Sequence, residues 1–206
     1  MKKHLASRII VLLVVMLLLF GASGIVNILS LNKIKAQIND VESVYLGIEA
    51  ERVDMAYNVD NLKNYINLIA LLPIPEATDG MCERQDDAIE SVETNFANIE
   101  SMINKTGNAN LLSAFQAYEE QIRPMEDVLR TEVSIYQSEG QSQSAMGVAL
   151  SLNEMMTPIE EAQTVFSDEL SAARTANFKQ SEAVIRQAKL YVYASLGIFV
   201  VVFVIV

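Results

Sequence analysis

Stripes of apolar residues spaced three and four apart run along most of the chain. The first stripe passes from Leu31 to Ile69 through twelve positions, of which eleven are apolar or aromatic and one is Arg52. Shorter stripes occupy residues 89–103, 111–129 and 148–173. This spacing places the apolar side chains of each stretch on one face of an α-helix. The pattern therefore predicts four amphipathic helices, each with one apolar face to bury.

Glycine and proline mark three breaks between the stripes. The breaks fall at residues 73–80, at Thr106-Gly107-Asn108 and at Glu139-Gly140. They predict helices that end near residue 72, span about 81–105 and 109–139, and start near residue 144. Four one-striped helices joined by short turns bury their stripes most simply in an antiparallel up-down bundle. We therefore expect an all-α fold built on an antiparallel up-down four-helix bundle.

Two uncharged apolar runs, residues 9–28 and 190–206, flank the bundle. At a rise of about 1.5 Å per residue, a helix of about twenty residues spans the roughly 30 Å hydrocarbon layer of a bilayer. Lys2, Lys3 and Arg8 precede the first run, so the positive-inside rule places the N-terminus in the cytoplasm. We expect residues 1–8 in the cytoplasm, transmembrane helices at 9–28 and 190–206, and an extracytoplasmic bundle at 29–189. The location is then the inner or plasma membrane.

Each apolar run has a feature that bears on this interpretation. Ala22, Ser23 and Gly24 resemble a signal-peptidase cleavage site, which makes a cleaved signal peptide the alternative to a first span. Against it, apolar residues resume at Ile25 and the helical pattern continues without a break. The second run reaches residue 206 with no basic flank after it, so we expect this chain to lack the cytoplasmic output of a longer protein.

Composition limits the catalytic, metal-binding and nucleic-acid-binding functions that the chain can have. The chain has one Cys (Cys82) and one His (His4), a count that excludes disulfide frameworks, zinc clusters and His-based or Cys-His catalysis. With 26 acidic and 15 basic residues, the net charge of −11 would repel nucleic-acid phosphates. We therefore expect no enzyme activity, no cofactor, no metal site and no nucleic-acid partner.

The order of these segments resembles the sensory domain of bacterial methyl-accepting chemotaxis proteins together with its two flanking spans. The resemblance covers nearly the whole chain and is architectural. It implies a membrane receptor that dimerises through the first helix and passes a signal through the first and fourth helices. It also implies binding of a small molecule, or of a periplasmic or extracellular binding protein, between helices or across the dimer. The alternative function is a membrane-anchored structural or adaptor bundle that binds a partner protein.

Arg52 is the only charge on the first stripe. The aspartate- and serine-type receptors of the chemotaxis family hold a ligand carboxylate with closely spaced arginines on the first helix, where only Arg52 is available here. A buried guanidinium needs a carboxylate or an anionic ligand to offset its desolvation. Counting helical rise from the turns places Gln116, Glu119 and Asp168 at the same height. We interpret Arg52 as the partner of Asp168 or Glu169, within the chain or across a dimer interface, or as a side chain that snorkels out of the seam. Contact with an anionic ligand is the alternative.

Pro124 and Pro158 fall inside the third and fourth predicted helices, where proline removes a backbone donor and bends the helix. The same counting brings both to the level of Asp60 and Asn61. Two bent helices at one level could open a pocket, unless each proline is tolerated separately. The ligand-binding candidates around that level, in addition to Arg52, are Asn58, Lys63, Tyr65, Arg123, Met155 and Thr157.

An acidic run on the second predicted helix comprises Asp86, Asp87, Glu90 and Glu93. Carboxylates three and four residues apart share one helix face and could hold a divalent cation. Acidic residues are also favoured in the first turns of a helix by its dipole. We interpret the run as a solvated face.

Overall fold

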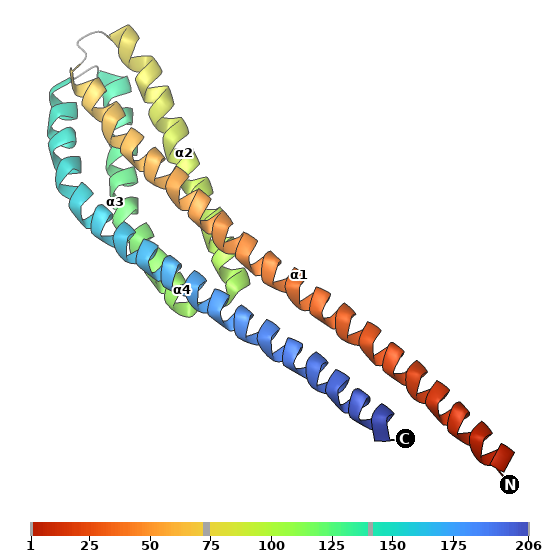
Figure 1. The fold of residues 1–206 in the computed structure, drawn as a ribbon. Coiled ribbons are helices and arrows are strands. Elements are labelled where there is room, and N and C mark those ends of the chain that lie inside the picture. Colours follow the sequence, from red (N-terminus) through yellow and green to blue (C-terminus); the bar gives the residue numbers. More distant parts are fainter. Residues whose placement is uncertain (1, 72–74, 140–141, 206) are drawn as a thin grey trace. The chain divides into compact units, whose positions relative to one another are not determined.

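The chain folds into long α-helices. The computed structural model describes residues 2–71, 75–139 and 142–205, with side chains for 10–11, 14–18, 20–68, 80–131, 146–198 and 200–201. The described residues form four helices: α1 Lys2–Leu71, α2 Pro75–Thr106, α3 Ala109–Glu139 and α4 Ser142–Ile205 (Figure 1). Only Gly107 and Asn108 among the described residues lie outside a helix. The predicted all-α class is therefore confirmed.

The start of α2 differs from the prediction. The helix begins at Pro75 and not near Met81, so Asp79 and Gly80 are helical and the turn predicted there is wrong. Proline suits the first helical position, because its ring presets φ and its missing N–H would have no partner there. The remainder of the predicted break at 72–74, and the break at Gly140, lie outside the described residues.

The turn between α2 and α3 is built by three residues. Gly107 has a φ of 65°, a left-handed conformation that is accessible to glycine because it has no Cβ. Asn108 then caps α3: its Oδ1 accepts hydrogen bonds from the backbone N–H groups of Asn110 and Leu111, both at 3.1 Å. The Thr106 hydroxyl donates to the Ile103 carbonyl at 2.7 Å. Local chemistry therefore fixes where the chain reverses.

Residues Ser43–Thr175 form one compact unit of the chain, and residues 1–42 together with 176–206 form another. In the Ser43–Thr175 unit all four helices contribute buried apolar side chains. Every member of the predicted α2 and α3 stripes is buried. On α4, Met156 is buried, whereas the predicted Met155 is half-buried. The aromatic centre of this core is formed by Phe96, Phe115, Tyr118 and Phe166, with ring centroids of neighbouring pairs 5.5–6.2 Å apart.

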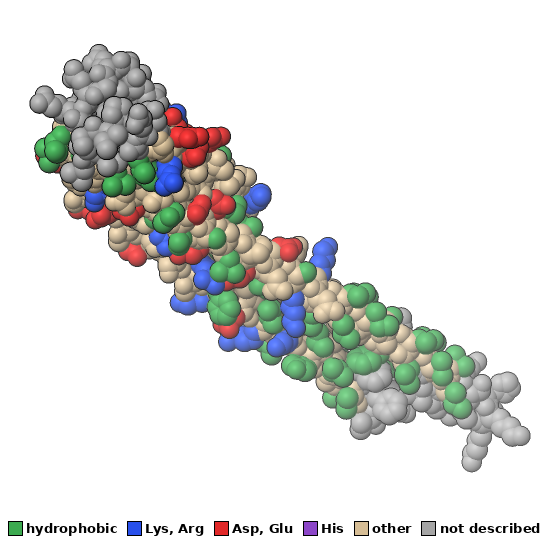
Figure 2. All heavy atoms as spheres, turned by 90° about the horizontal axis from the view of Figure 1, so that it is seen from above, with side chains coloured by type: hydrophobic (Ala, Val, Ile, Leu, Met, Phe, Trp, Pro, Cys, Tyr) green, Lys and Arg blue, Asp and Glu red, His purple; other side chains and the backbone are tan. Residues whose placement is uncertain are grey.

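In the unit of residues 1–42 and 176–206, many of the described apolar side chains are exposed. Those of Ile10, Leu18, Ile25, Tyr191 and Ile198 are 61–69% exposed, and Figure 2 shows how densely hydrophobic side chains cover this surface. By length and composition, one helix among the described residues can cross a membrane. This helix is the Val14–Leu68 part of α1, with a window of mean hydropathy 2.3 and no buried residue in that window. The predicted second span reaches residue 206, and that residue and several neighbouring side chains lie outside the described part.

Two glycine substitutions test the helix boundaries. Gly107→Ala should lower the free energy of unfolding by about 1–2 kcal/mol, because alanine is strained at positive φ. Gly80→Ala should raise it by about 0.5–1 kcal/mol, since Gly80 is helical, exposed and has no neighbouring atom within 4 Å of an added Cβ. Thermal unfolding of the full chain in detergent, followed by circular dichroism, measures both. Destabilisation by Gly80→Ala would instead indicate a turn at that residue.

Candidate functional site

Among the described side chains of the Ser43–Thr175 unit, three polar ones are buried: Gln85, Asn95 and Glu126, each at most 3% exposed. All three lie on α2 or α3, beside or on the apolar stripes. None was among the predicted site residues. A buried polar group costs free energy unless it has a hydrogen-bond partner. The surroundings of these three side chains therefore show where polar interactions interrupt the apolar core.

Asn95 joins α2 to α1. Its Nδ2 donates to Glu51 Oε2 at 2.8 Å and lies 3.2 Å from Asp54 Oδ2. Its Oδ1 accepts a hydrogen bond from Asn58 Nδ2 at 3.1 Å. One buried amide thus holds three side chains on successive turns of α1, and Asn58, a predicted ligand contact, takes part in this interhelical network.

A polar hollow of about 500 Å³ lies beside Asn95, between α1 and α2. Carboxylates, hydroxyls and amides line it: Glu51, Asp54, Asp87, Glu90, Ser91, Thr94, Asn95 and Asn98. Two members of the predicted acidic run, Asp87 and Glu90, therefore face this hollow. Its four carboxylates can accept hydrogen bonds from an ammonium group and balance its charge. Among the described residues, no group of three or more His, Cys, Asp or Glu side chains could hold a metal ion.

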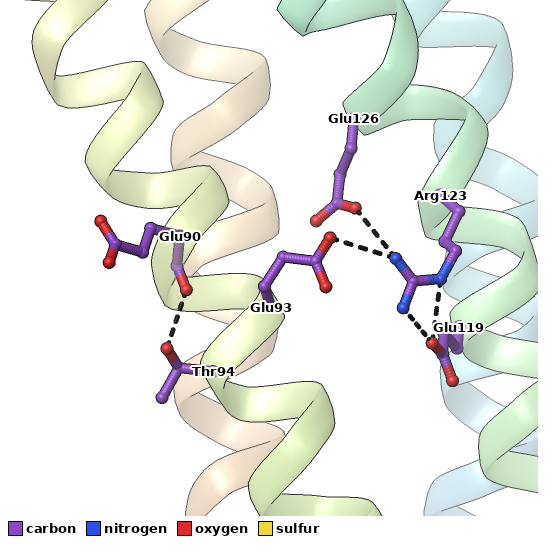
Figure 3. Close-up of polar contacts among 6 residues, drawn as sticks. All are labelled: Glu90, Glu93, Thr94, Glu119, Arg123 and Glu126. Atoms are coloured by element: carbon purple, nitrogen blue, oxygen red, sulfur yellow. Dashed lines mark hydrogen bonds and ion pairs between the residues drawn. The ribbon is translucent and has the colours of Figure 1, made fainter.

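Arg123 organises a second polar cluster, between α2 and α3 (Figure 3). Its guanidinium pairs with Glu119 one turn back on α3 and with Glu93 on α2, the latter at 3.1 Å. It also lies 3.9 Å from Glu126 Oε2 and 5.1 Å from the centre of the Phe96 ring. One cation is therefore shared by three carboxylates and an aromatic face.

Glu126 is the buried member of this cluster. Desolvation, together with the negative charge of Glu93 on α2, raises the pKa of Glu126 to about 7. Arg123 and Arg130 act in the opposite direction, and Asp127 adds a small further increase. Its Oε1 is buried and has no hydrogen-bond partner. A carboxyl group in this environment binds a proton near neutral pH.

The Arg52 guanidinium has a different partner from the one predicted. It binds Glu49 on the preceding turn of α1, with Nη2–Oε1 and Nε–Oε2 distances of 2.6 and 2.9 Å, so the predicted pairing with Asp168 or Glu169 inside the chain is wrong. The same pairing across a dimer interface stays a prediction. A carboxylate three residues away on the same helix reaches the guanidinium without crossing the core. This bond lowers the pKa of Glu49.

Tyr118 lies in the aromatic centre of the core. Burial raises the pKa of its hydroxyl to about 12.

The structure distributes the other predicted ligand residues over several environments. Arg123 and Asn58 contact different α2 residues, Glu93 and Asn95, in the two polar clusters. Lys63, Tyr65 and Met155 are half-buried, and Thr157 is exposed. Pro124 and Pro158 both lie on exposed positions inside helices. The pocket at the proline level stays a prediction, while several polar groups converge on the hollow beside Asn95.

Comparison with known proteins adds no relative. No family model, no curated protein and no solved structure matches this chain.

Glu126 makes stability depend on pH. Its folded pKa of about 7 lies above the ordinary value of 4.5, so the folded protein binds a proton that the unfolded chain releases between these values. Stability should therefore fall as pH rises from about 5 to 8, by at most about 3 kcal/mol from this group. Glu126→Gln should remove this fall and raise the melting temperature at pH 8.

The matched control is Glu120→Gln, an exposed carboxylate on the same helix. It should leave the pH profile of the melting temperature unchanged. If Glu126→Gln and the unsubstituted protein lose stability in parallel above pH 6, Glu126 does not carry the effect.

Proposed function

We propose that the chain is the extracytoplasmic ligand-sensing input module of a transmembrane, chemoreceptor-like signal transducer. The observation that carries the proposal is helix continuity: α1 and α4 each contribute to the buried core of Ser43–Thr175 and continue as one helix into exposed apolar segments. In this proposal residues 9–28 and 190–206 cross the inner or plasma membrane, and residues 29–189 are extracytoplasmic. A helix that belongs to both a sensor and a span can carry a displacement between them.

The proposed sensor is an antiparallel up-down four-helix bundle. The tight turn at Gly107 supports it, because the turn reverses the chain between α2 and α3. Cross-helix contacts support it as well. Asn95 links α2 to α1, Phe96 meets Phe115 between α2 and α3, and Phe115 meets Phe166 between α3 and α4.

The hollow beside Asn95 is the proposed ligand site. Its lining favours a small cationic molecule such as an amine, because four carboxylates surround it and no basic side chain lines it. Arg52 is already paired with Glu49, which disfavours the anionic ligand considered from the sequence. Since the hollow lies between α1 and α2, a ligand there would shift α1, the helix that continues toward the membrane.

A homodimer through α1 is part of the proposal. In the Ser43–Thr175 unit, α1 carries a second apolar stripe opposite its buried one, formed by Leu46, Ala50, Val53 and Tyr57 at spacings of four, three and four. Its three large members are 49%, 54% and 65% exposed in the monomer. A seam with this spacing is the form that packs against a second copy of the same helix. We call it the exposed α1 stripe.

A thermal-shift screen of the full chain tests ligand sensing. A small amine should raise the melting temperature with the concentration dependence RT ln(1 + [L]/Kd). Asp87→Asn combined with Glu90→Gln should abolish the shift, because two charges leave the hollow. Asp86→Asn combined with Glu83→Gln removes two exposed charges of α2 that do not line the hollow, and should preserve the shift.

Other outcomes of the screen separate the alternatives. A shift produced by carboxylates and lost in Arg52→Met would restore the anionic ligand. A protein that no small molecule stabilises would favour the adaptor function, in which the bundle binds a partner protein.

Cysteine cross-linking tests the dimer. In a Cys82→Ala background, cysteines at Val53 and Tyr57 should form disulfide-linked dimers in membranes within minutes of mild oxidation. Ser101→Cys, an exposed position on α2, should stay monomeric. Equal cross-linking at all three positions would show random collision and contradict an interface on the exposed α1 stripe.

A further inference from the structure

Basic side chains gather in the unit of residues 1–42 and 176–206, next to its apolar segments. Lys33 and Lys35 on α1, and Arg186 and Lys189 on α4, are all exposed. Residues 29–39 and 183–189 contain these four basic residues and no carboxylate, and Asp40 and Glu182 are the acidic residues that border the two stretches. Figure 2 shows Lys and Arg side chains gathered where the apolar surface ends. We call Lys33, Lys35, Arg186 and Lys189 the basic collar.

The collar lies at the depth of lipid headgroups if residues 9–28 and 190–206 fill the hydrocarbon layer. Helical rise places the Cα atoms of Lys189 and Arg186 about 1.5 and 6 Å beyond residue 190, and those of Lys33 and Lys35 about 7.5 and 10 Å beyond residue 28. The interfacial layer is about 5–8 Å thick on each side of the bilayer. Long basic side chains extend by several ångströms, so all four charges reach this layer.

The α4 side of the collar borders an open hollow. A hollow of about 520 Å³ is lined there by Lys179, Glu182, Ala183, Ile185, Arg186 and Lys189. Ala183 and Ile185 are the apolar members of this lining, and Glu182 is its one carboxylate. Tyr191 and Tyr193, each 67% exposed, follow directly on the membrane side, where tyrosines are typical of the bilayer interface.

The charge of the collar contrasts with that of the remaining chain. Ser43–Thr175 carries seven basic and 23 acidic residues, a net charge of −16. A concentration of positive charge against that background is selective for an anionic partner. A phosphodiester joined to acyl chains suits both the cationic groups and the apolar side chains beside them, whereas a free phosphate suits only the first.

We propose that the basic collar binds the phosphodiester headgroups of anionic phospholipids at the membrane surface. The proposal rests on the membrane embedding that forms part of the proposed function. Bound headgroups would fix the depth of α1 and α4 in the bilayer. A signal that shifts α1 along its axis would then have to move its lysines relative to these lipids.

Lipid copurification tests the proposal with the full chain. Affinity-tagged protein in detergent is incubated with equal amounts of phosphatidylglycerol and phosphatidylcholine, captured and washed, and the bound lipids are quantified by mass spectrometry. We expect the unsubstituted protein to enrich phosphatidylglycerol at least tenfold. Each basic side chain near an anionic membrane surface is expected to raise the affinity for anionic lipid by up to about fivefold. Arg186→Gln combined with Lys189→Gln should reduce the enrichment at least fivefold, and substitution of all four collar residues by Gln should bring the ratio to about one.

The control, Arg84→Gln with Lys105→Gln, removes two exposed basic residues of α2 and should leave the ratio unchanged. Equal loss in this control, or a ratio of one in the unsubstituted protein, would overturn the proposal. Loss of enrichment in millimolar glycerol phosphate would instead assign the collar to soluble phosphate and overturn the lipid assignment.

Alkaline carbonate extraction from phosphatidylcholine vesicles distinguishes failure of the collar proposal from failure of membrane embedding. Protein that resists extraction but shows no lipid preference contradicts the collar proposal alone. Protein that is extracted contradicts membrane embedding, and with it both proposals.

Discussion

Burial of one apolar face from each of four helices is the interaction on which the Ser43–Thr175 unit depends. The rings of Phe96, Phe115 and Phe166 come from three different helices and meet within 6.2 Å, so α2, α3 and α4 are held at one level by contact between large side chains. On α1, Ile48, Met55 and Leu62 are fully buried along the same seam. Removal of this apolar area from water drives the assembly, because a single isolated amphipathic helix has nothing against which to bury its stripe.

The polar groups inside this apolar frame are what make it specific. Asn95 binds three side chains of α1, which fixes the axial position of α2 relative to α1. Arg123 reaches Glu93 across the α2–α3 contact, while Glu126 stays buried beside them with one oxygen unpartnered. Polar groups with complete hydrogen bonds restrict how far helices can slide along one another. A buried carboxyl group with one unpartnered oxygen, such as Glu126, instead makes the core sensitive to protonation. The α1–α2 and α2–α3 contacts thus combine apolar packing with hydrogen bonds and ion pairs.

Continuous helices relate this frame to the proposed function. A ligand between α1 and α2 would act on the helix that carries the long apolar segment, and an α-helix transmits an axial displacement because its backbone hydrogen bonds make it stiff along its axis. Three surfaces of α1 have different surroundings in the proposed function. The buried stripe packs against the other three helices, the exposed α1 stripe would pack against a second copy, and the apolar segment would face lipid.

The sequence by itself determined the all-α class, the stripes on α2 and α3 and the turn at Gly107, because helical periodicity and turn chemistry are local properties. It misplaced the start of α2, since Asp79-Gly80 has the composition of a turn, yet the helix beginning at Pro75 continues through it. The sequence analysis also overlooked Glu49, which lies one turn before Arg52 on the same helix and is a local partner for it. Only the tertiary structure decided the roles of Asn95 and Glu126. These two residues are neighbours of the stripe residues Phe96 and Met125, and their burial depends on how wide a face each helix presents to the others. Heptad counting identifies the central residues of a buried helix face. It does not say how many flanking residues are buried with them, because that depends on the packing of the facing helices.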